Sequence, residues 1–242
     1  MSRSRRVHAR PLRRQHRLIA LAVGSAFAAG ASPLFANPSG PSVASGSAGF
    51  AVNGNQLTIT NTPGAIINWQ QFSIAKDEIT RFIQQNNLSA VLNRVTGQDP
   101  SVILGQLISN GRVFLINSAG IAIGKGALID VAGFTASTLN IADGDFLANR
   151  LRFSGSGAEG KLKNEGTIRA QDGNFVYLIA PNVENTKDGS ITVARGEVVI
   201  AAGKTVELVN SGTPEIRVEY TAPQNEAVNA GQVVAASGRV GI

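Results

Sequence analysis

The sequence lacks cysteine entirely, and its only two histidines, His8 and His16, lie near its start. Without cysteine, a disulfide-stapled scaffold and thiolate metal binding are excluded. Beyond residue 16 the chain also lacks the imidazole that most general acid–base chemistry, Ser-His-Asp and Cys-His nucleophiles, and ordinary zinc sites require. Function classes that depend on these groups are therefore excluded for nearly the whole chain.

Acidic residues are also missing from the first 76 positions, since the first acid is Asp77. The formal net charge is +6, but seven arginines lie within the first 17 residues, and without them 15 basic residues stand against 16 acidic ones. A nucleic-acid-binding domain needs a basic patch within the fold itself. We therefore predict no nucleic-acid partner.

The N-terminus has the pattern of an export signal. The arginine-rich start ends at Arg17, an apolar run covers 18–31, and "SPLFANP" follows. The pattern predicts a signal peptide over 1–36, cleaved after Ala36, with Ala31 as the alternative site. The apolar run has about 14 residues, which is short of the roughly 20 that span a membrane. "RRQHR" is not a convincing twin-arginine signal, so the general secretory route is favoured.

Residues 37–52 are rich in Pro, Gly and Ser, which predicts a linker or a loosely ordered start. Many apolar runs of four to seven residues follow, rich in β-branched side chains and separated by Asn, Gly, Asp, Ser or Pro. This pattern is typical of short strands and turns. The one sizeable helix candidate is 76–95, for which an irregular excursion is the alternative.

An internal repeat supports a particular all-β fold. Residues 163–182 are echoed by 184–203, with Ile168 matching Ile191 and Gly173 matching Gly196, each 23 positions apart. A period just above 20 without helices favours a β-solenoid over an antiparallel sandwich. Aromatic residues make up only 5% of the chain, which suits a narrow aliphatic interior. We expect Trp69 to seal the first coil, and core or end-cap positions for Phe114, Phe134, Phe153 and Phe175.

The glycine-rich stretch 119–127, "AGIAIGKGA", raises the possibility of a phosphate-binding loop. Three residues rather than four separate Gly120 from Gly124, and Gly126 follows Lys125 where a Ser or Thr would bind magnesium. The next segment has a strand pattern, whereas a phosphate loop opens a helix. We therefore interpret the three glycines as turns between strands and Lys125 as a solvated residue.

Asp143 and Asp145 are the candidate carboxylate pair, because some β-solenoids are polysaccharide lyases or hydrolases that use acidic clusters. Their context, "ADGDF", is interpreted as a glycine turn with solvated acids. A calcium site would need more oxygen ligands. A carbohydrate-active β-helix enzyme nevertheless remains the alternative function, because acids on different coils can converge in space.

Several segments resemble one known family. They are "AIINWQQFSI" (65–74), "SAVLNRVTG" (89–97), "ILGQLISNGRVFLIN" (103–117), "GFTASTLNI" (133–141) and "YTAPQNEAVNAG" (220–231). They resemble the N-terminal secretion domain of two-partner-secretion exoproteins, the filamentous-haemagglutinin-like group, and within it the high-molecular-weight adhesin branch. The resemblance extends from about Asn53 to the end, so the β-helical domain is assigned to 53–242.

The resemblance implies an all-β fold, a right-handed parallel β-helix with an N-terminal cap and extra-helical strands. It implies no catalysis and no cofactor. It also implies a product of a Gram-negative bacterium that crosses the periplasm and becomes secreted or surface-bound. The implied partner is an outer-membrane β-barrel transporter with periplasmic polypeptide-binding domains, and an adhesive function would add a host or matrix carbohydrate or protein receptor.

The family's hallmark Asn-Pro-Asn-Gly-Ile falls on residues 117–121, where Asn117, Gly120 and Ile121 match while Ser118 and Ala119 depart. The family's second asparagine-rich motif falls near Asn86 and Asn87. The three matching hallmark residues, together with Asn86 and Asn87 of the imperfectly matched second motif, are the predicted secretion motif.

The repeat pattern stops at Ile242 without a polar cap. We therefore expect a truncated gene product, a fragment of a longer exoprotein, or an unusually short exoprotein.

Overall fold

The computed structural model describes residues 37–242 except 211–213, 220–225 and 237. The predicted signal peptide over 1–36 and both cleavage positions, Ala36 and Ala31, lie outside the described residues. Within the described part, no helix has the length and apolar character needed to cross a membrane. The helix there is the five-residue α1 (Asp143–Leu147), and the other elements are strands.

Three sheets form the body of the domain. The first sheet contains, in spatial order, β2 (Ala48–Asn53), β3 (Gln56–Asn61), β5 (Ile79–Ile83), β8 (Gln106–Ser109), β11 (Leu128–Val131), β16 (Thr167–Ala170), β19 (Ser190–Ala194) and β24 (Gln232–Ala236). The second contains β1 (Ser42–Ser45), β4 (Ala65–Trp69), β6 (Ala90–Val95), β9 (Arg112–Ile116), β12 (Gly133–Ser137), β17 (Phe175–Ala180), β20 (Glu197–Ala202) and β25 (Arg239–Gly241). The third contains β7 (Ser101–Ile103), β10 (Ile121–Ile123), β15 (Leu162–Asn164), β18 (Asn182–Asn185) and β23 (Glu226–Asn229).

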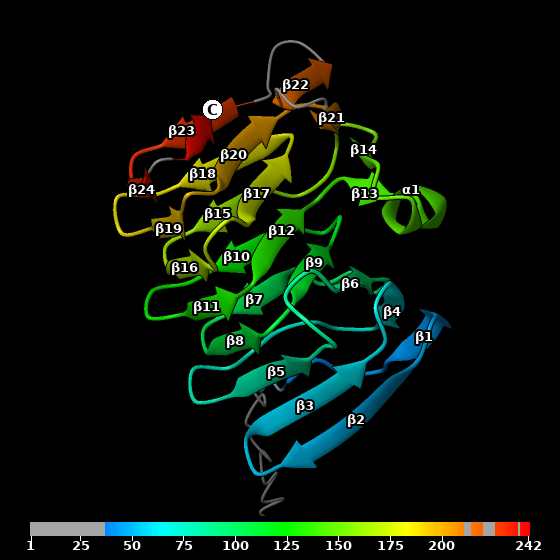
Figure 1. Ribbon diagram of the computed structural model, residues 1–242. Coiled ribbons are helices and arrows are strands. Elements are labelled where there is room, and N and C mark those ends of the chain that lie inside the picture. Colours follow the sequence, from blue (N-terminus) through cyan, green and yellow to red (C-terminus); the bar gives the residue numbers. More distant parts are fainter. Residues whose placement is uncertain (1–36, 211–213, 220–225, 237) are drawn as a thin grey trace, which may run out of the picture. The chain divides into compact units, whose positions relative to one another are not determined.

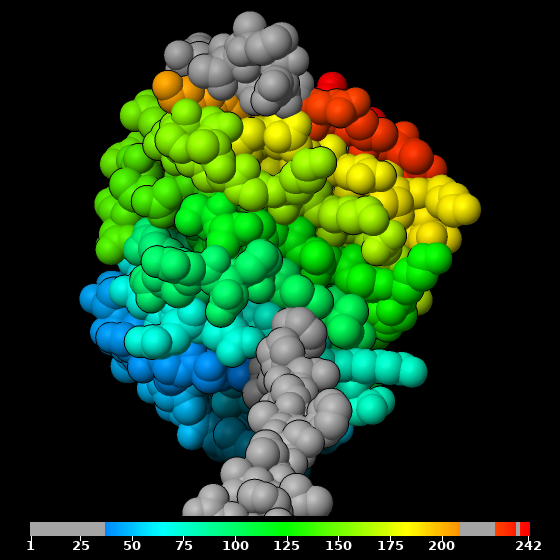
Figure 2. Space-filling view, turned by 180° about the vertical axis from the view of Figure 1, so that it is seen from behind, coloured from blue at the N-terminus to red at the C-terminus, as the bar shows by residue number. Residues whose placement is uncertain are grey.

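The chain visits the three sheets in the same order in each coil. From β8 it passes to β9 and then β10, and the next coil repeats this with β11, β12 and β15 (Figure 1). Apart from β1 and β2, the strands of these sheets pair in parallel with the coil before and after. The fold is therefore the predicted parallel β-helix, right-handed as parallel crossover connections almost always are. Seen from behind, the sequence colours follow one another from one end to the other (Figure 2).

Alternating aliphatic residues explain the stacking. In the first sheet one inward position is occupied in successive coils by Leu107, Ile129, Ile168 and Ile191, and the strand register places each beside the next. All four are fully buried. Each buried aliphatic side chain of this size contributes about 1.5–3 kcal/mol, so such rows supply most of the stability of the coils.

The internal repeat is confirmed in part. Ile168 pairs directly with Ile191, as the 23-residue spacing predicts. Phe175 pairs with Glu197, only 22 positions further on, because the turn before the second sheet is one residue shorter in the later coil. Counted from that pair, the equivalent of Gly173 is Arg195 and not Gly196. Both residues have a left-handed backbone, with φ of 74° and 46°.

Strands outside the helix cover one face of it. The chain leaves the coils after β12 and again after β20, and these excursions form a sheet of β13 (Asn140–Ile141), β14 (Leu151–Ser154), β21 (Thr205–Asn210) and β22 (Pro214–Glu219). A second apolar cluster, which includes Phe114, Phe146 and Phe153, lies between this sheet and the outer side of the second sheet. Phe134 belongs to the inner core, and the partly buried Phe175 packs against the second cluster. The predicted core positions are confirmed for Phe114, Phe134 and Phe153, while Phe175 lies half-buried at the edge of the second cluster.

The start of the domain differs from the expected linker over 37–52, because this segment forms β1 and most of β2. Both pair antiparallel, β1 with β4 and β2 with β3, and so close the N-terminal end of the coils. Trp69 is fully buried beneath this cap, with Phe50 and Phe72 packed edge-on against its ring at 5.6 Å. Its indole donates a hydrogen bond to Asn93 Oδ1 at 3.0 Å. The cap explains why a segment rich in Gly and Ser is ordered.

The predicted helix at 76–95 is wrong, and the segment contains β5, a turn and β6. In β5 the alternate residues Thr80 and Phe82 are buried, a strand pattern that the neighbouring polar residues obscure. β3 and β8 flank β5 and pair with it in parallel. These non-local hydrogen bonds replace those a helix would make, so tertiary context overrides local propensity.

Candidate functional site

The hallmark turn is built around the side chain of Asn117, which is 1% exposed. Its amide nitrogen donates to the Asp99 carbonyl and to Ser101 Oγ, both at 3.0 Å. Its Oδ1 accepts a hydrogen bond from the Ala119 backbone, also at 3.0 Å. Asn117 therefore closes its own turn and ties it to the coil below. No local pattern marks Ser101 as a partner, because only the stacking of coils brings it to Asn117.

Gly120 and Ile121 complete the turn. Gly120 has a φ of 127°, and a side chain on it would lie 3.3 Å from the Lys161 carbonyl of the next coil. A glycine suits this position because other residues rarely adopt such a backbone. Ile121 begins β10 and is 1% exposed in the inner core. All three matching hallmark residues are thus buried in the folded domain.

The departures at Ser118 and Ala119 leave the backbone turn intact. The Gly120 amide donates to the Asn117 carbonyl at 3.1 Å, and the Ser118 carbonyl accepts from Gly160 at 2.9 Å. These bonds use backbone atoms that any residue supplies, so the turn forms without the proline and second asparagine of the family pattern.

Asn86 and Asn87 occupy an exposed turn at a different corner of the coil. Asn86 Oδ1 accepts hydrogen bonds from the backbone of Leu88 and from both the backbone and hydroxyl of Ser89, at 2.9–3.1 Å. This turn joins the first sheet to the second, whereas the Asn117 turn joins the second to the third. The structure therefore does not bring the two parts of the predicted motif together.

The glycine-rich stretch 119–127 contains β10 and leads directly into β11. A phosphate-binding loop opens a helix instead, so the stretch does not have that geometry. Gly126 adopts a φ of 82°, as expected of a turn glycine, while Gly124 does not have a left-handed backbone. Lys125 is 68% exposed and pairs with Asp188 at 2.9 Å. This hydrogen-bonded pair raises the pKa of Lys125 and lowers the pKa of Asp188. The interpretation of Lys125 as a surface turn residue is confirmed.

Asp143 and Asp145 lie at the start of α1 and not in a simple turn. Asp143 pairs with Arg94 and Asp145 with Arg150, each at 2.7 Å. Asp143 thus links the extra-helical segment to β6, whereas the pair of Asp145 lies within that segment. Within the described residues no group of three His, Cys, Asp or Glu side chains is arranged to bind a metal ion.

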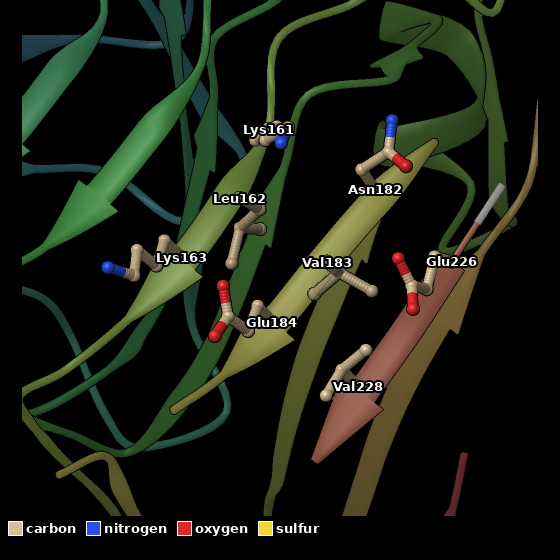
Figure 3. A pocket seen from close by; sticks show the side chains of 8 residues that line it. All are labelled: Lys161, Leu162, Lys163, Asn182, Val183, Glu184, Glu226 and Val228. Carbon is tan, nitrogen blue, oxygen red and sulfur yellow. The ribbon is translucent and has the colours of Figure 1, made fainter. Parts of the chain in front are cut away.

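A shallow groove of about 340 Å³ crosses the outer side of the third sheet over β15, β18 and β23. Two acids line it, Glu184 and Glu226, on neighbouring strands (Figure 3). Both are exposed, whereas a general acid in glycoside hydrolysis is a carboxyl removed from water. The groove therefore offers little support for the alternative of a carbohydrate-active enzyme.

Comparison with known families decides the classification. The family model described as the TPS secretion domain matches residues 35–242. The chain belongs to this family. Exoproteins with this domain are secreted through the periplasm of Gram-negative bacteria, and the family implies a cognate transporter in general. It is a family of secretion domains and not a known enzyme family.

Relatives and solved structures agree with this family. A protein named heme/hemopexin-binding protein from Haemophilus influenzae is 33% identical over 209 residues, which are 82% of this chain but 23% of that protein. A second protein of that name and species is 34% identical over 102 residues, covering 42% of this chain and 11% of its own length. The chain thus spans less than a quarter of these relatives.

Among solved structures, the HMW1 secretion domain from Haemophilus influenzae matches with a TM-score of 0.79 and 40% identity, over 84% of this chain and 55% of that one. This match confirms the resemblance to the high-molecular-weight adhesin branch. The filamentous hemagglutinin secretion domain matches with a TM-score of 0.51 and 17% identity, over 83% and 75% of the two chains. At that identity it supports the fold alone.

Proposed function

We propose that this chain is the non-catalytic secretion domain of an adhesin-type exoprotein. It is exported by the Sec machinery, recognised in the periplasm by an outer-membrane β-barrel transporter with polypeptide-binding domains, and delivered to the cell surface or the medium. The observation that carries this proposal is the family match over 35–242, which directly follows the arginine-rich and apolar stretch of residues 1–36.

An open strand edge supports recognition by the transporter. β2 is the outermost strand of the first sheet and is exposed along most of its length. Its hairpin with β3 has a two-residue turn, so Asn53 and Gln56 form the hydrogen-bonded pair next to it. The N–H of the neighbouring Val52 then points to the open edge, where a strand of a partner can pair with it.

The buried position of Asn117, Gly120 and Ile121 restricts how the hallmark residues act. A direct contact between them and a transporter requires a chain that has not yet folded. In the folded domain they act through the turn, whereas the exposed Asn87 is open to contact in both states.

The test is co-expression of the chain with and without a transporter of this class, with the processed chain measured in the medium. We expect secretion only when the transporter is present, and equal release without it contradicts the proposal. Val52→Pro removes the edge N–H and should reduce secretion strongly, while Val52→Ala, which keeps it, should not. If both variants are secreted equally, pairing through this edge is refuted while dependence on the transporter still stands.

A further inference from the structure

A polar pocket of about 430 Å³ lies where the turns between the first and second sheets meet the extra-helical β14. Its wall contains three arginines, Arg112, Arg195 and Arg239, and one acid, Glu197. Its volume falls within the range of about 300–1,000 Å³ that is typical of small-molecule sites. It is separate from the hallmark turn, since Asn117 and its partners do not line it.

Arg112 is held in place without an acidic partner. Its Nε donates to Asn174 Oδ1 at 3.0 Å, and its guanidinium lies 5.2 Å from the centre of the Phe175 ring. The register places Gly133 beside Arg112, and a side chain there would meet both Arg112 and Phe175 at 3.2–3.4 Å. Within the described residues neither Arg112 nor Arg239 forms an ion pair with an acid. Burial lowers the pKa of the Arg112 guanidinium, so the group is partly desolvated and its charge is not balanced locally.

Aromatic stacking fixes the rest of the wall. Phe175 stacks on Tyr177 with ring centres 4.4 Å apart and planes 6° apart. The Tyr177 hydroxyl donates to Glu197 Oε2 at 2.6 Å. This bond orients the carboxylate, whose other oxygen has no hydrogen bond within the described part of the chain. The pocket thus combines guanidinium donors with an oriented acceptor.

Backbone strain is concentrated at the same pocket. Two non-glycine residues of the described chain have a left-handed backbone, Asn149 and Arg195, and both line it. The equivalent of Arg195 one coil earlier is Gly173, the residue that this conformation favours. Arg195 therefore occupies a backbone conformation that a glycine would adopt at a lower free-energy cost. Asp172 pairs with its guanidinium and holds it at the rim.

We propose that this pocket binds a sugar residue that carries an anionic group, a carboxylate or a sulfate, as part of an acidic glycan. Arg112 and Arg239, which form no ion pair within the described residues, take the anionic group through their guanidinium donors. Glu197 and Asn174 take the hydroxyls. A sugar carries hydroxyl donors for the Glu197 carboxylate, whereas the side chains of an acidic peptide carry only further acceptors, and this favours the glycan. This proposal is independent of the transporter.

The test is a titration of the processed chain, purified without the arginine-rich residues 1–36, with three probes: a trigalacturonate, a sulfated oligosaccharide and a neutral galactose trimer. Binding of either acidic probe at least ten times tighter than the neutral one is expected, and the stronger of the two identifies the anionic group. A neutral trimer that binds equally, a hexaglutamate that binds more tightly than both sugars, or no binding by either acidic probe overturns the proposal.

Variants separate the pocket from general charge attraction. Arg239→Gln should weaken binding of the acidic probe at least tenfold. Because Arg239 is exposed and forms no ion pair within the described residues, Arg239→Gln should leave the thermal midpoint unchanged, so lost binding cannot be ascribed to unfolding. Arg169 is an exposed arginine on the first sheet, and Arg169→Gln is the matched control. An equal loss in that control refutes a specific site.

Discussion

Replacing Asn117 with alanine should destabilise the domain far more than its position in a turn suggests. The side chain is 1% exposed and makes three hydrogen bonds. At about 0.5–1.5 kcal/mol for each bond, and with the fully buried Ser101 losing its partner, the expected loss is about 2–4 kcal/mol. For a domain of this size that corresponds to a midpoint roughly 4–16 °C lower.

The assay is equilibrium unfolding in urea followed by tryptophan fluorescence, because Trp69 is the only tryptophan and is fully buried. Asn117→Asp separates hydrogen bonding from volume, since it keeps the shape but cannot donate to the Asp99 carbonyl, which only accepts, and it should be at least as destabilising as alanine. The exposed Asn87→Ala is the control and should stay within about 0.5 kcal/mol of the parent. If Asn117→Ala also stays within that range, the structural role of the hallmark asparagine is refuted.

Three further perturbations test the packing and charges of the coils. Gly189→Ala places a methyl group 2.6 Å from the Asn164 carbonyl of the coil below. In a thermal melt it should lower the free energy of unfolding by about 1–3 kcal/mol. Gly144→Ala is the matched control, because Gly144 lies in α1 with open space around it, and it should be neutral or raise the free energy of unfolding by up to about 1 kcal/mol. Burial opposes the charged form of Glu159, but hydrogen bonds from its own loop outweigh it and lower its pKa. The Glu159 carboxylate therefore stabilises the loop at pH values above the ordinary glutamate pKa, and this stabilisation is lost as the pH falls through the lowered pKa. In an NMR titration, the chemical shifts of the loop amides should change in that acidic range. They should stay constant in Glu159→Gln. Lys125→Ala should leave both the thermal midpoint and secretion unchanged, because its ion pair is on the surface.

Each of these has a result that contradicts it. Equal thermal midpoints for Gly189→Ala and Gly144→Ala would mean that the coils do not approach each other as closely as the structure shows. A loop titration that persists in Glu159→Gln would assign the pH response to another group. A marked loss of secretion in Lys125→Ala would give the glycine-rich stretch a role that its exposure and geometry do not indicate.

The sequence alone determined the class of fold and the repeat, because both depend on local patterns. Short β-branched runs separated by turn residues predict strands, and the 23-residue match of Ile168 and Ile191 predicts that they stack, as they do. Excluding histidine and cysteine chemistry needed only the composition. The family resemblance also follows from linear motifs.

Tertiary structure decided what non-local contacts control. Residues 76–95 form strands because β3 and β8 pair with β5, and the Gly- and Ser-rich start is ordered because β2 pairs with β3 and covers Trp69. The partners of Asn117, which come from the coil below, and the shift that aligns Arg195 with Gly173 also depend on how coils stack. A linear pattern records spacing along the chain. These features instead depend on which residues become neighbours in space, up to the 27 positions that separate Ile79 from Gln106, and that register is set only when the strands pack.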